Sequence, residues 1–490
     1  MVHFALLPDM LAAQSPDAPA VADDLSGQLT NAEFATRVEH AAGRLWEAGV
    51  RAGDVVAVKL PNRTELVVTL FAAWRLGAAA TPINPGLTAT EVDFQLGDSR
   101  ATVLVSTDAT AGVTVIGPDE LVQPATTLAP HHEASDDGLA LLIYTSGTTG
   151  RPKGVELTHR NISSMAQAMV GAMEFDADAH SLLILPLFHV NGIVVSVLSP
   201  LLAGGQATIT GRFRPQTFFD FVERVRPTYF SAVPAIYAML VALPDDVTPD
   251  TSSVRFAVCG AAPMPVELID KFETRFGIPI VEGYGLSEGT CASTCNPIGG
   301  VRKPGTAGPA LPGLTVAVMD RQGNLLAPGE RGEVVVSGPT VMRGYLNRPE
   351  ETAKTIVDGW LHTGDIGFLD QDGYLTLVDR AKDMIIRGGE NIYPKEIESV
   401  MYSHRSVYEA AVVGRPDPVL GEVPVAFVRF ADGFGDCVDE LRAHLADRLA
   451  KYKLPVTISA LPELPKNPVG KIDKPALRRR LAESISAPVS

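Results

Sequence analysis

The chain of 490 residues is too long for one compact core, and its length favours about three domains or sub-domains. Hydrophobic residues make up 46% of it and charged residues 20%, the composition of an ordinary soluble globular protein. The net charge of −16 argues against nucleic acid or an anionic membrane as the main partner, so an anionic ligand must be held by cations gathered in a local site.

The cysteines and the N-terminus indicate the compartment. Four cysteines are too few for a disulfide framework in a chain of this size, and no nearby histidine completes a zinc set around Cys291 and Cys295. The N-terminus lacks the basic and sustained apolar segments of a signal peptide, and no uncharged run makes a convincing membrane span. These features predict a cytoplasmic protein with free thiols and no integral membrane association.

Helix and strand signals alternate through the first part of the chain, which predicts an α/β fold. Thr30 and Glu33 have the spacing of a capping box at the start of the first long helix. A later helix is expected from about Ile162, behind a capping turn that begins at Thr158. Other helices are expected at 65–76, 215–225, 235–243 and 266–276, and strands at 55–60, 78–81, 138–144, 229–233, 254–260 and 278–282.

The pattern changes in the last third of the chain. Short β-runs separated by turn residues predict a β-rich sub-domain at about 310–379. The segment after Asp379 has its own strands and amphipathic helices, enough for a separate core. We therefore expect a large N-terminal domain of stacked α/β sub-domains at 1–381, and a small mobile α+β domain at 382–490.

The run Tyr144–Gly154 is the most informative stretch of the sequence. It holds three glycines, four Ser/Thr hydroxyls and two cations, the chemistry of a loop that holds a polyphosphate. It is not the P-loop of the NTPases, because Lys153 is followed by a strand-like segment instead of a helix. A surface hairpin is the alternative, but the ordered motif is long and specific enough to disfavour it.

Several strand ends carry further candidate residues. Gly260 ends an apolar strand, where it either lets the chain turn or allows the flat face of a ligand to approach the backbone. Tyr284, Ser287 and Glu288 supply a stacking plane, a hydroxyl and a carboxylate, which suit an aromatic base, a phosphate and magnesium. The same segment could also be no more than a glycine-rich loop.

Two more residues leave a structural and a functional reading open. His189 lies in a bend after a strand expected from Leu182, and it is either a structural hydrogen-bond partner or part of a pocket lining. Asp365 lies between Gly364 and Ile366, and it either caps a turn or binds the hydroxyls of a ribose.

Taken together, these segments resemble the adenylate-forming superfamily of acyl-CoA synthetases, luciferases and peptide-synthetase adenylation domains. The resemblance runs from about Leu29 to Arg480, and its motifs are highly specific in combination. One departure is Ser287, which stands where many members have threonine but keeps the hydroxyl. The motifs are at 144–154, 185–192, 260–264, 283–288, 360–365, 379–383, 387–394 and 467–471.

The resemblance implies a reaction in two steps. A carboxylate attacks the α-phosphorus of MgATP to give acyl-AMP and pyrophosphate; the small domain then rotates about a hinge at Lys382, and the thiol of CoA attacks the acyl carbonyl. The implied catalytic residues are Lys471, His189 and Glu288, with Glu288 as the magnesium ligand. The implied ATP-binding residues are Thr145, Ser146, Gly147, Thr148, Thr149, Gly150, Lys153, Gly260, Ala261, Ala262, Tyr284, Ser287, Asp365, Arg380 and Lys471. The segment implied to lie beside CoA is Arg387, Gly388, Gly389 and Glu390.

The segments that would line the acyl pocket are apolar. Val190–Leu202 and Ser231–Leu243 contain no charged residue, and Met239 stands where malonyl-CoA synthetases carry an arginine. We therefore expect an aliphatic or aromatic monocarboxylic acid as substrate of a monomer or homodimer. The expected lining is Phe188, His189, Val190, Ile193, Val233, Ile236, Gly260, Gly283 and Gly285.

Other functions stay open. The run 296–305 also resembles oxalate-type CoA ligases. A stand-alone adenylating enzyme that transfers the acyl group to an amine or a carrier protein would share every first-step residue, although the segment Arg387–Glu390 favours CoA. A non-catalytic nucleotide-binding protein is disfavoured, because Glu288, Asp365 and Lys471 do little for the fold.

Overall fold

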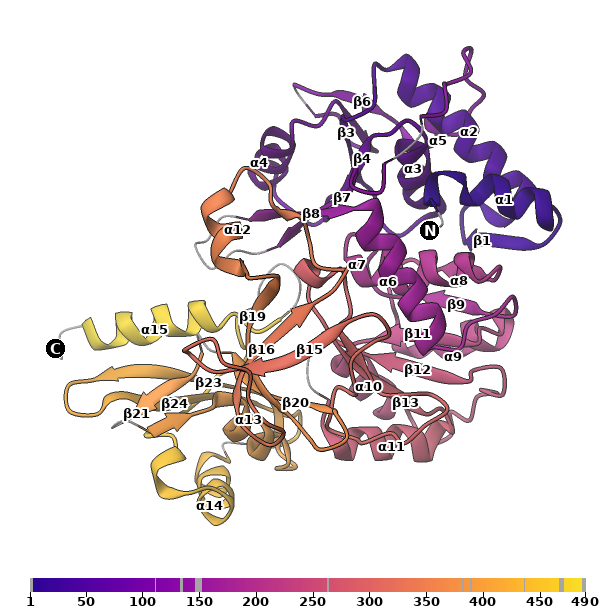
Figure 1. Ribbon diagram of the computed structural model, residues 1–490. Helices are drawn as coiled ribbons and strands as arrows, with labels where there is room; N and C mark the ends of the chain where they lie inside the picture. The colour runs from indigo at the N-terminus through magenta and orange to yellow at the C-terminus, as the bar shows by residue number, and fades with distance from the viewer. Residues whose placement is uncertain are drawn as a thin grey trace. The chain divides into compact units, whose positions relative to one another are not determined.

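The computed structural model describes residues 3–486 except 111, 133–134, 146–151, 262–263, 381–382, 388–389, 436 and 467–470 (Figure 1). The chain forms two compact units. The first contains 1–317, 335–363 and 370–375, and the second contains 318–334, 364–369 and 376–490.

The first unit contains a seven-stranded sheet with the order β17-β8-β7-β4-β3-β5-β6. Its strands from β7 to β6 are parallel, whereas β8 runs antiparallel to both β7 and β17. The bounds are β3 (Val55–Lys59), β4 (Ala79–Pro82), β5 (Val103–Ser106), β6 (Thr114–Ile116), β7 (Leu139–Thr145), β8 (Lys153–Thr158) and β17 (Gly344–Tyr345).

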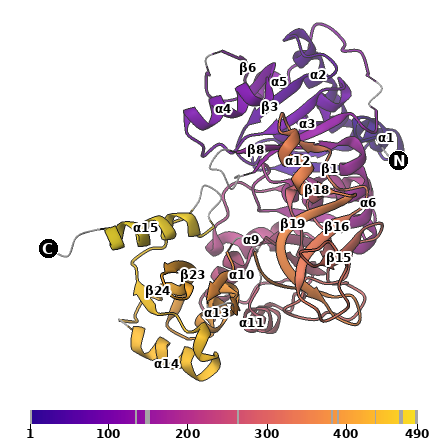
Figure 2. The ribbon, with the colours of Figure 1, turned by 60° about the vertical axis from the view of Figure 1, so that its left-hand side comes forward.

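An eight-stranded sheet, with the order β14-β13-β12-β11-β9-β10-β1-β2, lies below the first sheet in the views of Figures 1 and 2. Its six central strands are parallel, and the outer strands β14 and β2 are antiparallel to their neighbours. The bounds are β1 (Pro19–Asp23), β2 (Gly27–Thr30), β9 (His180–Leu183), β10 (Gln206–Ile209), β11 (Tyr229–Ala232), β12 (Phe256–Cys259), β13 (Ile280–Tyr284) and β14 (Thr294–Cys295).

Helices cover these sheets and complete one hydrophobic core that contains side chains of both. A second core lies between the eight-stranded sheet and α9–α11. The bounds in this unit are η1 (Phe4–Leu6), α1 (Leu7–Gln14), α2 (Asn31–Glu47), α3 (Thr64–Arg75), α4 (Ala89–Ser99), α5 (Pro118–Leu121), α6 (His159–Ala172), α7 (Val190–Ile193), the π-helix η2 (Val194–Leu198), α8 (Ser199–Leu202), α9 (Pro215–Val225), α10 (Pro234–Val241), α11 (Val266–Phe276), η3 (Ser287–Gly289) and α12 (Pro349–Thr355).

The β-rich part of the chain forms a five-stranded sheet with the order β15-β16-β19-β18, in which β20 also pairs with β19. The longest strand of this sheet, β19, contains Gly364, whose φ is 69°. The bounds are β15 (Thr315–Met319), β16 (Gly332–Ser337), β18 (Ile356–Val357), β19 (Trp360–Leu369) and β20 (Leu375–Arg380).

The remainder of the second unit is an α+β structure. The strands follow the order β22-β21-β24-β23, and β25 pairs in parallel with β24. Helices α13 and α14 pack on one face of this sheet and α15 on the other, because alternate residues of β23 and β24 belong to two different cores. The bounds are β21 (Ile385–Arg387), β22 (Glu390–Ile392), α13 (Pro394–Tyr402), β23 (Val407–Asp417), β24 (Gly421–Phe430), α14 (Val438–Arg448), η4 (Lys451–Lys453), β25 (Thr457–Ala460) and α15 (Lys474–Ser486).

The α/β class predicted from the sequence is confirmed, with two local corrections. The strand expected from Leu182 is β9, which begins at His180 and ends at Leu183, so the motif around His189 is a loop and a helix start. Helix α6 begins at His159, because Thr158 and Asn161 form a capping box inside the expected turn. Within the described part of the chain, no helix is long and apolar enough to cross a membrane.

Candidate functional site

The candidate residues of the first unit gather at one edge of the eight-stranded sheet. Strands β9, β11, β12 and β13 are adjacent and parallel, so their carboxyl ends lie at the same edge. The motif with His189 follows β9, Gly260 follows β12, and Tyr284 ends β13. In open α/β sheets this edge is where ligands bind.

Gly260 is not required by the fold. Its φ is not in the left-handed range, and among the residues that the structure describes the nearest atom to an added Cβ is the Gly283 carbonyl oxygen, at 3.9 Å. The next residue, Ala261, is exposed and has a φ of 67°, a conformation that costs energy for a residue with a side chain. The backbone here is therefore open to the flat face of a ligand. Ala262 lies outside the described residues.

The segment after β13 is tightly built. Tyr284 is 9% exposed, and Gly285 has no room for a side chain because a Cβ would collide with the Cys291 carbonyl oxygen. Ser287 and Glu288 follow in the short helix η3, and both are partly exposed. The stacking plane, hydroxyl and carboxylate predicted from the sequence thus lie within five residues, at the end of β13 and in the helix η3 that follows it.

Lys153 lies at the start of β8, where it pairs with Thr145 at the end of β7. Its ammonium group forms an ion pair with Glu351 of α12 and lies 5.0 Å from the centre of the Tyr345 ring. The hydroxyl of Tyr345 donates a hydrogen bond of 2.8 Å to Oε1 of Glu288. Residues 146–150 of the expected phosphate loop lie outside the described residues.

Tyr345 and Glu351 are residues that sequence reasoning missed. In the sequence, Gly344–Tyr345 looks like one short β-run among several. Their proximity to Lys153 and Glu288 arises only when β17 pairs with β8. The pattern of a glycine and a tyrosine shortly before Pro349 was the only available signal.

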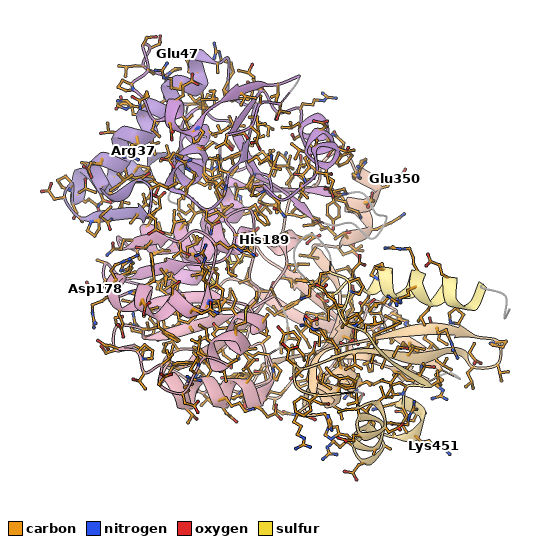
Figure 3. All side chains as sticks on the ribbon, turned by 180° about the vertical axis from the view of Figure 1, so that it is seen from behind. Arg37, Glu47, Asp178, His189, Glu350 and Lys451 are labelled. Carbon is orange, nitrogen blue, oxygen red and sulfur yellow. The ribbon has the colours of Figure 1, made fainter. Side chains whose placement is uncertain are left out.

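His189 is the N-cap residue of α7, and its ring centre lies 4.5 Å from that of Phe188 (Figure 3). The other expected apolar pocket residues belong to two hydrophobic cores. Val190 and Ile193 belong to the core shared by the two sheets, whereas Ile236 belongs to the core under α9–α11. Val233 is partly exposed, and Gly283 would place a Cβ 3.1 Å from the Thr294 carbonyl oxygen.

A buried carboxyl group lies two residues before the end of β13. Glu282 on β13 is 9% exposed, and its Oε2 accepts a hydrogen bond of 3.0 Å from the Gly305 N–H. Burial raises the pKa of Glu282 to about 7. Burial also raises the pKa of the Cys291 and Cys295 thiols to about 12, so both are neutral at pH 7.

The second unit carries the remaining candidates. Asp365 is 5% exposed on β19, and Lys471 is exposed shortly before α15. Burial lowers the pKa of Lys395, and the carboxylates of Asp379 and Asp365 oppose that shift. Asp379 also accepts a hydrogen bond of 2.8 Å from the Lys395 N–H at the start of α13. Arg380, Arg387 and Glu390 lie in strands β20, β21 and β22, whereas Lys382, Gly388 and Gly389 lie outside the described residues.

The donor set fits a magnesium ion that arrives with a nucleotide. Such an ion takes most ligands from phosphates and water and one or two carboxylates from the protein. Glu288 offers one partly exposed carboxylate, oriented through Oε1 by Tyr345. The described residues contain no group of three or more His, Cys, Asp or Glu side chains that could hold an ion without a nucleotide.

Comparisons with known proteins agree with this geometry. The family model "AMP-binding enzyme" matches residues 9–346, and the model of its C-terminal domain matches 396–471. A feruloyl-CoA synthase from Amycolatopsis sp. is 41% identical over 96% of this chain and 97% of its own length. A long-chain-fatty-acid–CoA ligase from Bacillus subtilis is 35% identical over 96% of this chain and 92% of its own length.

A solved structure, the O-succinylbenzoate CoA synthetase of Bacillus subtilis in complex with ATP and magnesium, superposes with a TM-score of 0.86. The two sequences are 32% identical, and the superposition covers 97% of this chain and 99% of the synthetase. The chain therefore belongs to the AMP-binding enzyme family and is an adenylate-forming acyl-CoA synthetase.

Proposed function

We propose that this enzyme activates an apolar aliphatic or aromatic monocarboxylic acid as acyl-AMP and transfers the acyl group to CoA. The observation that carries the proposal is the edge of the eight-stranded sheet. There the open backbone at Gly260, the buried Tyr284 and the carboxylate of Glu288 follow two adjacent strands. The open backbone and the tyrosine ring can hold an adenine ring between them, and the carboxylate can bind the metal ion that accompanies the phosphates.

The proposal assigns roles to the following site residues. Gly260, Ala261 and Tyr284 hold adenine, Ser287 contacts the α-phosphate, and Thr145 and Lys153 bind the outer phosphates. Asp365 and Arg380 bind ribose. Glu288 holds magnesium, which supplies positive charge to the phosphates when bound. Lys471 lies between the substrate carboxylate and the α-phosphate, where a cation lowers the barrier for joining two anions.

The two-step reaction requires the C-terminal part of the chain to change position. We propose the boundary at 381/382, with Lys382 as hinge, an N-terminal domain at 1–381 and a C-terminal domain at 382–490. The segment Arg387–Glu390 then lies beside CoA in the second step. The family model of the C-terminal domain begins downstream of this boundary, at residue 396, which supports a separate C-terminal domain.

The choice of acid rests on the uncharged segments 190–202 and 231–243. Met239 is 38% exposed on α10 and supplies no charge for a second carboxylate. The relatives that act on ferulate and on long-chain fatty acids favour a monocarboxylic acid. The cysteines are few and are free thiols, which favours action in the cytoplasm. A monomer or homodimer suffices for the site.

One screen tests the proposal. Pyrophosphate release is measured with ATP and magnesium across aromatic, aliphatic and dicarboxylic acids, oxalate included. The acids that react are then incubated with and without CoA, and the products are identified by mass spectrometry. We expect release with monocarboxylic acids and a CoA thioester as product. A product that never contains CoA would instead identify a stand-alone adenylating enzyme, and release with oxalate alone an oxalate-type ligase.

A further inference from the structure

Tyr345 contacts two residues that are far apart in the sequence and share one proposed ligand. Its hydroxyl donates to Oε1 of Glu288 at 2.8 Å, and its ring lies 5.0 Å from the ammonium group of Lys153. A cation at this distance from an aromatic ring is attracted to its face.

The backbone fixes Tyr345 in this place. The residue pairs with Val155 of β8, two positions after Lys153, and its N–H donates to Oγ1 of Thr352 at 2.9 Å. Three residues earlier, the Met342 N–H donates to the Glu288 carbonyl oxygen at 2.8 Å. The segment is therefore attached both to the strand that carries Lys153 and to the turn that carries Glu288.

Lys153 has a second contact that limits its freedom. It forms an ion pair with Glu351 on α12, the helix that also carries Glu350, labelled in Figure 3. Arg348, at the start of this helix, lies 3.8 Å from Glu351 and 3.9 Å from Asp98. A long lysine side chain loses much rotational freedom when it is held between a ring and a carboxylate, so less remains to be lost when it binds phosphate.

We propose that Tyr345 is a positioning residue that orients the Glu288 carboxylate for the metal and Lys153 for the outer phosphates of the nucleotide. This inference rests on the proposed roles of Glu288 and Lys153. A hydrogen bond to Oε1 fixes the plane of the carboxylate and directs its other oxygen. Outer hydrogen-bond partners of metal ligands of this kind change metal affinity by roughly 10–100-fold when they are removed.

The test separates the hydroxyl from the ring. Tyr345→Phe removes the hydroxyl, and with it the hydrogen bond to Glu288, but keeps the ring, whereas Tyr345→Leu removes the ring as well. Binding of Mn²⁺ in the presence of ATP is measured by electron paramagnetic resonance, and binding of ATP in EDTA by calorimetry. We expect Tyr345→Phe to weaken Mn²⁺ binding by roughly tenfold or more with metal-free ATP binding unchanged, and Tyr345→Leu to weaken both.

Tyr374 provides a matched control in the same unit. Its hydroxyl donates to the Val301 carbonyl oxygen at 2.6 Å, and the ammonium group of Lys303 lies 4.2 Å from its ring centre. Tyr374→Phe therefore loses a comparable bond away from the candidate site and should leave Mn²⁺ binding unchanged. Equal thermal unfolding midpoints of both Phe variants would show that each is folded.

Glu288→Gln separates this inference from the proposed function. If Glu288→Gln weakens Mn²⁺ binding and Tyr345→Phe does not, the positioning role of Tyr345 is overturned while Glu288 remains the metal ligand. If Glu288→Gln leaves Mn²⁺ binding unchanged, the assigned role of Glu288 is wrong, and the inference for Tyr345 fails with it.

Discussion

At the scale of single residues, Glu282 couples the stability of the site edge to pH. Its carboxyl group is buried on β13, where Oε2 accepts a hydrogen bond from the Gly305 N–H. Burial therefore raises its pKa from 4.5 to about 7 in the folded chain. The folded protein therefore favours the protonated carboxyl group. The stability that this preference provides is fully present below the unfolded-state pKa of 4.5 and is lost as pH rises toward 7.

Glu282→Gln should remove this dependence. The amide oxygen can still accept from Gly305, and no charge is buried at high pH. Relative to the unchanged chain, we expect the variant to gain stability as pH rises from about 5 to about 8, by about 3 kcal/mol for the full shift. Thermal unfolding midpoints of both proteins across this range measure the difference. A constant difference at all pH values would contradict the prediction.

Gly260 and Gly285 make a contrasting pair of residues. A Cβ at Gly260 meets only an ordinary van der Waals contact among the described residues, whereas a Cβ at Gly285 collides with the Cys291 backbone. Gly260→Ala should thus preserve the unfolding midpoint and weaken ATP binding by about tenfold, or 1.4 kcal/mol. Gly285→Ala should lower the midpoint. Calorimetry with ATP and thermal unfolding test both variants. Unchanged ATP affinity in Gly260→Ala would show that adenine does not bind against Gly260.

At the scale of elements, a partly buried ion pair joins α13 to α15. Lys474 lies 2.8 Å from Glu398, and their side chains are 17% and 14% exposed. Glu398 also accepts a hydrogen bond of 2.7 Å from the Val412 N–H, and its burial raises its pKa. Lys474 is three residues after Lys471, so this pair anchors the helix that follows the proposed catalytic lysine.

Lys474→Met should destabilise the chain by about 2 kcal/mol, because it leaves a partly buried carboxylate without its partner. The double variant Glu398→Gln/Lys474→Met should recover most of this loss. Arg448→Met, which breaks the exposed pair with Asp447, is the control and should cost about 0–1 kcal/mol. Thermal unfolding of the four proteins provides the comparison. Equal losses in the single and double variants would show that the pair itself matters little.

Elements with local signals are those that the sequence predicts well. The Thr30–Glu33 capping box is present, and helices α9 and α11 have the predicted bounds, because capping groups and apolar periodicity act within a few residues. The π-helix after His189 and the pairing of the short strand β17 with β8 were not predicted. Both depend on packing between distant segments, and the contact of Tyr345 with Glu288 spans 57 positions of sequence.

The same distinction explains the candidate site. Gly260, Tyr284 and Glu288 follow apolar strands, and adjacent parallel strands bring such residues to one edge whatever the intervening helices are. No such rule fixes the positions of the residues expected to line the acyl pocket. Ile193 and Ile236 are both apolar and both follow strands of one sheet, yet they pack in different cores, because the face that a helix buries depends on its neighbours.

At the scale of the whole molecule, the two compact units divide the proposed site residues. Lys153, Tyr284 and Glu288 belong to the first unit, and Asp365 and Lys471 belong to the second. The reaction has two steps with different needs. The first joins two anions at the α-phosphate, and the second brings a thiol to the acyl carbonyl while AMP leaves. A cation needed only in the first step can lie on a part of the chain that moves away before the second.

Lys471→Ala should therefore separate the two half-reactions. Without the cation at the α-phosphate, acyl-AMP formation should fall by roughly 10²–10³-fold, while transfer from supplied acyl-AMP to CoA stays within about twofold. Isotope exchange between pyrophosphate and ATP measures the first step, and thioester formation from synthetic acyl-AMP measures the second. Lys451→Ala, an exposed residue on η4 labelled in Figure 3, is the control and should change neither rate. Equal loss of both half-reactions would mean that Lys471 acts in the second step as well. The C-terminal part of the chain would then not have to move Lys471 out of the site between the two steps.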